Sequence, residues 1–97
     1  MEKLEPLYDV RSKYGGFKLV RVTFDDSFRS SIHSHEDVDE LIYITNGEGI
    51  FQVDSKRIEL SKGKMLFIES NKSHLVEGKS NLECLAIHLY HCRKEKI

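Results

Sequence analysis

Apolar and polar residues alternate along most of this chain from residue 17 onward, and a period of two indicates β-strands. In FKLVRVTF (17–24), apolar residues alternate with polar ones, and Val, Leu and Phe suit the pleated surface of a sheet. Short stretches rich in Asp, Asn, Gly, Ser and Lys separate this run from similar runs downstream. The predicted strands are residues 17–24, 30–35, 40–45, 49–53, 57–60, 65–68, 74–77 and 82–90.

The two ends of the chain differ from its middle. Residues 1–14 carry no amphipathic helical pattern, and they form either an irregular segment or an edge strand. Residues 93–97, RKEKI, are mostly charged and are expected to fray.

The turns predict how the strands connect. Asn46-Gly47 predicts a hairpin between the strands that flank it, because a type I′ turn requires positive φ at both of its central residues. The other connections are a few residues long, so successive strands are expected to be antiparallel neighbours. About eight short strands with regular turns predict one all-β domain over residues 1–97, either a small barrel or a double-sheet jelly roll.

The composition is that of a folded domain, and it argues against nucleic acid and membranes as partners. Hydrophobic residues make up 39% of the chain and charged residues 32%, which allows a core beneath a heavily charged surface. The 15 basic and 16 acidic residues are interspersed, and no basic stripe indicates binding to nucleic acid or to a membrane. No run reaches the roughly 20 apolar residues that span a bilayer, and the start lacks a signal region, so we expect a cytoplasmic protein. Cys84 and Cys92 are too few for a disulfide framework.

The strongest candidates for chemistry are three histidines and a glutamate. His33 and His35 stand two residues apart, so on a strand they share a face with Cα atoms roughly 6.5 Å apart. Glu40 follows the short turn EDVD and begins the next strand, where its carboxylate can return beside the two imidazoles. The same strand phase turns Ile42 and Ile44 inward.

His74 opens another predicted strand, at the corresponding place in the second half of the chain. Together with His33, His35 and Glu40 it makes a mixed nitrogen and oxygen set that suits one divalent transition metal, namely Zn, Ni, Fe, Mn or Cu. Four protein ligands leave two positions of an octahedral ion open for water, dioxygen or a bidentate oxygen ligand. Imidazole binds metal in its neutral form, so metal affinity should fall below about pH 6.

The spacing of these residues resembles the first sequence motif of the cupin superfamily. That motif has H-x-H, four residues, E, six residues and G. Here the same spacings join His33, His35, Glu40 and Gly47, while Ser27 stands where the motif opens with glycine.

The second cupin motif has G, five residues, P-x-G, two residues, H, three residues and N. Gly63 and His74 match it. Glu69, Asn71 and Gly78 replace the proline, the glycine and the asparagine. These departures change the turn and leave the ligand positions intact, and Asn71 still tolerates the left-handed conformation.

The resemblance implies a cupin-type double-stranded β-helix, a jelly-roll barrel with the metal inside and with His33, His35, Glu40 and His74 as ligands. It also implies frequent homodimers. The stretch is similar to the sensor barrel of AraC-type transcription regulators as well. Two functions follow: a metal-dependent enzyme such as an oxygenase or isomerase acting on a small molecule, or a non-catalytic small-molecule sensor or binding module. Neither the catalytic residues nor the substrate can be named from the sequence.

Three further features bear on the cavity and the surface. His88 is in phase with Cys84 and could face the cavity, but we expect a partly exposed or interface histidine. Tyr43 is out of phase with Glu40 and should lie on an outer sheet face with Leu41, which a second copy could cover. His91 is expected on the surface.

The strand MLFI (65–68) is apolar on both faces, so its phase stays open. Either Met65 and Phe67 face inward, or Leu66 and Ile68 do.

Overall fold

The computed structural model describes residues 2–26, 28–30 and 32–91, which form strands joined by turns and one long irregular segment. The strands are β1 (Glu2–Ser12), β2 (Gly15–Phe24), β3 (Val38–Asn46), β4 (Glu48–Val53), β5 (Lys56–Ser61), β6 (Met65–Ile68), β7 (His74–Gly78) and β8 (Glu83–Tyr90). The described residues contain no helix that is long and apolar enough to cross a membrane.

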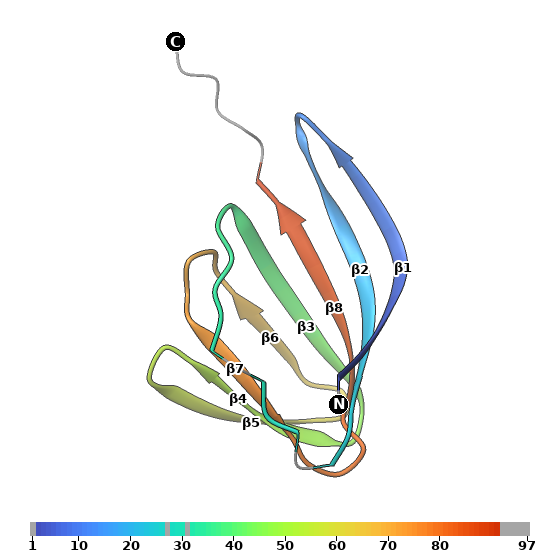
Figure 1. The fold of residues 1–97 in the computed structure, drawn as a ribbon, viewed down its shortest axis with the longest axis vertical. Helices are drawn as coiled ribbons and strands as arrows, with labels where there is room; N and C mark the ends of the chain where they lie inside the picture. Colours follow the sequence, from blue (N-terminus) through green and yellow to red (C-terminus); the bar gives the residue numbers. More distant parts are fainter. Residues whose placement is uncertain (1, 27, 31, 92–97) are drawn as a thin grey trace.

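Two antiparallel sheets face each other (Figure 1), which confirms the predicted all-β jelly roll. The larger sheet has the order β1-β2-β8-β3-β6, and the smaller has the order β5-β4-β7. Hairpins join β1 to β2 and β4 to β5, as short connections favour. Elsewhere the expectation of neighbouring successive strands is wrong, because β3 pairs with β6 and β8, far from it in sequence.

The hairpin predicted at Asn46-Gly47 is also wrong. These residues join β3 in the larger sheet to β4 in the smaller one, so they form a corner between sheets. Only Gly47 has positive φ, at 70°, whereas a type I′ turn needs two such residues. A Cβ at Gly47 would lie 2.0 Å from the carbonyl oxygen of Ser80, so the close approach of the neighbouring loop requires glycine here.

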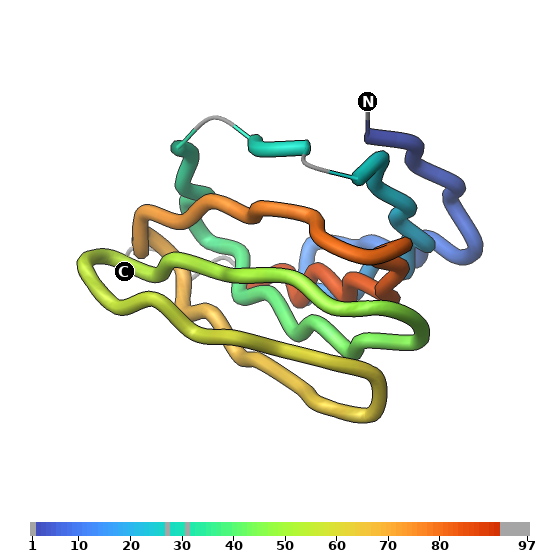
Figure 2. The backbone as a smooth tube through the Cα atoms, turned by 90° about the horizontal axis from the view of Figure 1, so that it is seen from below, coloured from blue at the N-terminus to red at the C-terminus, as the bar shows by residue number. Residues whose placement is uncertain are grey.

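The strand predicted over residues 30–35 is replaced by irregular chain. Residues 28–30 and 32–33 run beside β7 (Figure 2) and contact it through isolated bridges, Arg29 to Glu77 and His33 to His74. The backbone N–H of His33 donates to the carbonyl of His74 at 3.0 Å, and the N–H of His74 donates to the carbonyl of His33 at 2.8 Å. This exchange fixes the two histidines opposite each other without a continuous ladder.

The core lies between the two sheets. Ile42 and Ile44 point into it and are almost fully buried, as the phase of β3 predicted. On β6, Leu66 packs against the core and Ile68 is buried, whereas Met65 and Phe67 are exposed. The residues of this strand that face inward are therefore the aliphatic pair, the second of the two alternatives.

The N-terminal segment is an edge strand, one of the two alternatives. All of β1 is exposed, and it pairs only with β2 in the described chain. The register shifts between Pro6 and Tyr8, which marks a bulge at Leu7. Tyr8 of β1 packs on Phe17 of β2, with ring centroids 5.4 Å apart. The tail over residues 93–97 lies outside the described residues.

Candidate metal centre

The four candidate ligands, which come from separate parts of the sequence, converge at one end of the barrel. The ring centroids of His33 and His35 are 5.3 Å apart, and those of His33 and His74 are 4.1 Å apart. One nitrogen from each of His33, His35 and His74 lies within 4.8 Å of the others, close enough to hold a single ion. Glu40 reaches the same place from β3, with Oε1 at 3.4 Å from His74 Nε2 and 4.0 Å from His35 Nε2.

The backbone orients His74. Its Nδ1 lies 3.0 Å from the carbonyl oxygen of Lys72, which can only accept, so Nδ1 carries a proton and donates. The neutral ring therefore presents the lone pair of Nε2 to the centre. A second hydrogen bond that fixes the tautomer of a histidine ligand is typical of metal sites.

Two buried atoms in this cluster have no hydrogen-bond partner. Among the described residues, the buried side-chain atoms without a partner are Glu40 Oε1 and His74 Nε2, and they face each other. A buried polar atom left unsatisfied costs about 1–3 kcal/mol, so natural folds rarely keep such a pair without a use. A cation between an imidazole lone pair and a carboxylate oxygen would satisfy both atoms, so the residues present fit a divalent metal.

The charges in the cluster are strongly coupled. Burial raises the pKa of Glu40, but its interactions with His74 and His88 outweigh burial and lower the pKa to about 2. For His74, burial lowers the pKa, but the facing Glu40 outweighs it and the net shift is upward. Burial also lowers the pKa of His35, and the other imidazoles add to that effect. Glu40 is thus an ionised carboxylate at neutral pH.

His88 belongs to this cluster and so faces the cavity, the alternative that the sequence favoured less, although its side chain is also partly exposed, at 24%. It pairs across the sheet with Glu40, and its Nε2–H donates to Glu40 Oε2 at 3.3 Å. His35, Glu40 and His88 form a second group with ligand atoms within 4.8 Å of one another. In the sequence, the strand phase that His88 shares with Cys84 indicates that His88 can face inward. Only the pairing of β8 with β3 shows that it lies next to Glu40.

A cavity of about 580 Å³ lies behind the cluster, within the range of small-molecule sites. Its wall is mostly apolar, and the aliphatic and aromatic side chains that line it include Val20, Val22, Phe24, Phe28, Ile42, Phe51, Val76 and Ala86. Cys84 also lines it as a free thiol, and burial raises the pKa of that thiol to about 12. Cys84 is therefore a small core side chain, whereas Cys92 lies outside the described residues.

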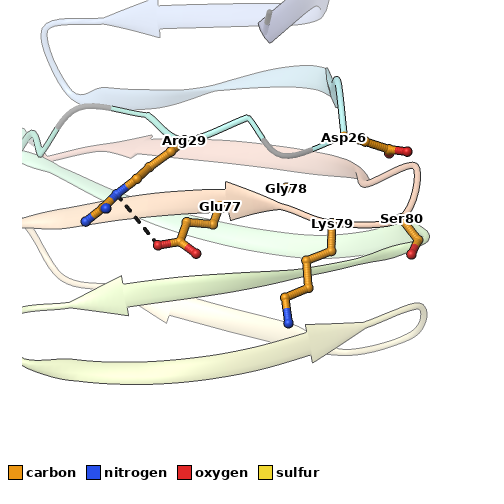
Figure 3. A pocket seen from close by; sticks show the side chains of 6 residues that line it. All are labelled: Asp26, Arg29, Glu77, Gly78, Lys79 and Ser80. Atoms are coloured by element: carbon orange, nitrogen blue, oxygen red, sulfur yellow. Dashed lines mark ion pairs between the residues drawn. The ribbon is translucent and has the colours of Figure 1, made fainter.

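A second hollow lies on the outside of β7 (Figure 3). It measures about 480 Å³ and is lined by Asp26, Arg29, Glu77, Gly78, Lys79 and Ser80. Arg29 Nε lies 3.6 Å from Glu77 Oε1, and Arg57 approaches the same oxygen at 3.7 Å. Glu77 is thus compensated by two arginines, and the cavity beside Glu40 remains the stronger candidate site.

The surface position expected for His91 is observed. Its Nε2 lies 2.7 Å from Asp39 Oδ2, and the backbone N–H of Ser70 donates to Asp39 Oδ1 at 2.8 Å. These contacts anchor the start of β3 next to Glu40.

Comparison with known proteins places this geometry in context. A stretch of 58 residues is 38% identical to an oxalate-binding protein of Thermotoga maritima and covers 58% of this chain and 48% of that protein. A stretch of 56 residues is 33% identical to a helix-turn-helix-type transcriptional regulator of Bacillus subtilis and covers 58% of this chain and 19% of the regulator. The match therefore spans less than half the length of these curated relatives.

Among solved structures, a protein described as a predicted oxalate decarboxylase of Thermotoga maritima has a TM-score of 0.78 and 27% identity, over 92% of this chain and 80% of that one. A sequence model of the cupin domain matches residues 20–90, which is more than half of the chain, and the chain therefore belongs to the cupin family.

Proposed function

We propose that this chain binds one divalent transition metal through His33, His35, Glu40 and His74 and holds a small carboxylate in the adjoining cavity. The observation that carries the proposal is the pair of buried, unpartnered atoms, Glu40 Oε1 and His74 Nε2, at 3.4 Å. The ligand set accepts Zn, Ni, Fe, Mn or Cu.

The carboxylate class of ligand is supported by two of the similar proteins, one an oxalate-binding protein and the other described as a predicted oxalate decarboxylase. When bound, the metal supplies a Lewis acid that attracts the oxygen atoms of such a ligand. The protein itself contributes a dry cavity and a partial balance of the metal's charge. The apolar wall excludes water, and Glu40 supplies one negative charge against the two positive charges of the ion. The remaining positive charge then favours an anionic ligand.

Two activities remain to be distinguished at this site. One is metal-dependent catalysis, as in an oxygenase or isomerase. The other is non-catalytic sensing or binding, which the similarity to a helix-turn-helix-type regulator favours. Metal-loaded protein that converts a carboxylate in a substrate panel is an enzyme. Protein that only gains thermal stability with the same compounds is a binding module.

The metal is tested by elemental analysis of native protein beside the double variant His33→Ala/His74→Ala. We expect about one ion per chain in the native protein and well under a tenth of that in the variant. His91→Ala is the matched control, because this histidine pairs with Asp39 on the surface and should leave metal content unchanged. Native protein that stays metal-free after incubation with each of the five ions would refute the proposal.

We further propose that the chain forms a homodimer through the outer face of the larger sheet. The row Tyr8, Leu19, Ile87, Leu41 and Phe67 crosses all the strands of that sheet on one face. Each residue of the row pairs with the next across neighbouring strands, so the row is continuous.

More exposed apolar side chains extend this row. Seven apolar side chains on this face are each between 37% and 56% exposed, namely Tyr8, Val10, Phe17, Tyr43, Met65, Phe67 and Leu89. They offer roughly 600 Å² of apolar surface, which approaches the roughly 800 Å² per partner of a stable interface. Sedimentation at micromolar concentration should therefore show a dimer.

A further inference from the structure

One row of side chains connects the candidate metal centre to the first hairpin. On the inner face of the larger sheet, Lys18 of β2 pairs with His88 of β8, and His88 pairs with Glu40 of β3. Lys18, His88 and Glu40 all line the cavity. Neighbouring strands lie about 4.8 Å apart, so the Cα atoms of Lys18 and Glu40 are roughly 10 Å apart.

Lys18 lines the cavity and makes no close ion pair among the described residues, although its charge attracts Asp9 at longer range. Within the described chain, no carboxylate oxygen lies within 4.0 Å of its ammonium group, although the cavity partly buries the residue. Asp9 stands opposite Lys18 in the strand register. Both of its oxygens are held by Arg11, at 2.9 and 2.7 Å. The other lining cation, Arg29, pairs with Glu77 (Figure 3).

The apolar side chains beside Lys18 on the inner face offer little competition for this charge. Val20 and Ala86, the next inward residues of β2 and β8, are apolar and buried. Glu40 is committed to the imidazoles, since His88 donates to Oε2 and His74 faces Oε1. A partly buried ammonium group facing an apolar cavity is most stable when an anion joins it.

We propose that Lys18 binds a carboxylate group of the cavity ligand and so selects short carboxylic acids of two to about five carbon atoms. One end of such an acid lies at the metal centre, and a second carboxylate meets Lys18. The roughly 10 Å between the Cα atoms of Lys18 and Glu40 favours a short ligand between the two anchors. This inference rests on the proposed metal site, but it assigns a separate residue and a separate ligand class.

The test uses isothermal titration calorimetry on metal-loaded protein, with oxalate, malonate and succinate as probes and acetamide as a neutral control. The variants are Lys18→Met, Lys18→Arg and, as the matched control, Lys56→Met, which removes an exposed lysine of β5 outside the cavity. Metal content is measured on every sample beforehand.

We expect Lys18→Met to weaken binding of the best acid at least about tenfold, the loss typical of a charge-assisted hydrogen bond. Its metal content should equal that of the native protein. Lys18→Arg should recover most of the affinity, and Lys56→Met should change nothing. The dissociation constant of the native protein should rise with salt more steeply than that of Lys18→Met.

The possible failures are distinguishable. Native protein without metal overturns the proposed function. Metal-loaded native protein that binds none of the acids, or that binds acetamide as well as it binds them, overturns the assigned ligand class. Equal acid affinity in native protein and Lys18→Met, at equal metal content, overturns the assignment of Lys18 alone.

Discussion

Replacing Glu40 with glutamine tests the electrostatic account of the cluster without any metal. The substitution keeps the size and shape of the side chain and removes its charge. In the metal-free protein Glu40 is 8% exposed, and the pKa of its carboxylate falls from 4.5 to about 2. At about 1.4 kcal/mol per pKa unit, this shift corresponds to about 3 kcal/mol of folding stability.

The sign of the pH dependence follows from the two coupled groups. Glu40 has a depressed pKa, so its contribution is present above pH 4.5 and is lost as pH falls toward about 2. His74 has a raised pKa, so its contribution is present below pH 6.5 and is lost as pH rises through its folded pKa. Both shifts describe one attraction, between the carboxylate and the imidazolium. The advantage of native protein over Glu40→Gln should therefore be largest between about pH 4.5 and 6.5.

The assay is urea unfolding of both proteins in EDTA at a series of pH values from 3 to 8. We expect a stability difference of about 3 kcal/mol near pH 5.5 that shrinks toward both ends of the series. Glu59→Gln removes an exposed carboxylate of β5 and should give a flat profile. A difference between native protein and Glu40→Gln that stays constant across the series would refute the coupling between Glu40 and the histidines.

Three further predictions test the core, the outer face and the buried thiol. Leu82 has no exposed surface, so Leu82→Ala should cost about 3–5 kcal/mol in chemical unfolding, and a loss below 1 kcal/mol would contradict its place in the core. Phe67→Lys puts a charge into the outer apolar face and should turn the proposed dimer into a monomer in sedimentation velocity, whereas a dimer that persists would move the interface elsewhere. In protein carrying Cys92→Ser, Cys84 should react with a thiol reagent at pH 8 at least about a hundredfold more slowly than after unfolding in urea, because its pKa is about 12. Equal rates would show that this thiol is open to solvent.

Much of the fold is readable from the sequence because strand phase follows from local alternation. The inward turn of Ile42 and Ile44 follows from the period of two in β3, and both residues are buried. The phase of β6 is not readable, since Met65, Leu66, Phe67 and Ile68 are apolar on both faces and only the packed core separates them.

The errors concern partners far apart in the sequence. Asn46-Gly47 has the local chemistry of a hairpin, but pairing of β3 with β8 and of β4 with β7 places its two flanks in different sheets. His88 is similar. Its neighbour Glu40 is 48 residues away, and no local pattern shows that the two strands are adjacent. The sequence therefore brought the four candidate ligands together, but it left a cavity-facing His88 as the less favoured of two alternatives.

The bulge in β1 has a consequence for assembly. A long open strand edge invites another chain to add to the sheet, and unchecked addition leads to fibrils. Here Pro6 lacks an N–H group, and the extra residue Leu7 interrupts the ladder beside it. Edge-to-edge growth is thus discouraged along the most accessible margin of the molecule. The proposed homodimer would bury the outer face of the larger sheet and leave this edge unused.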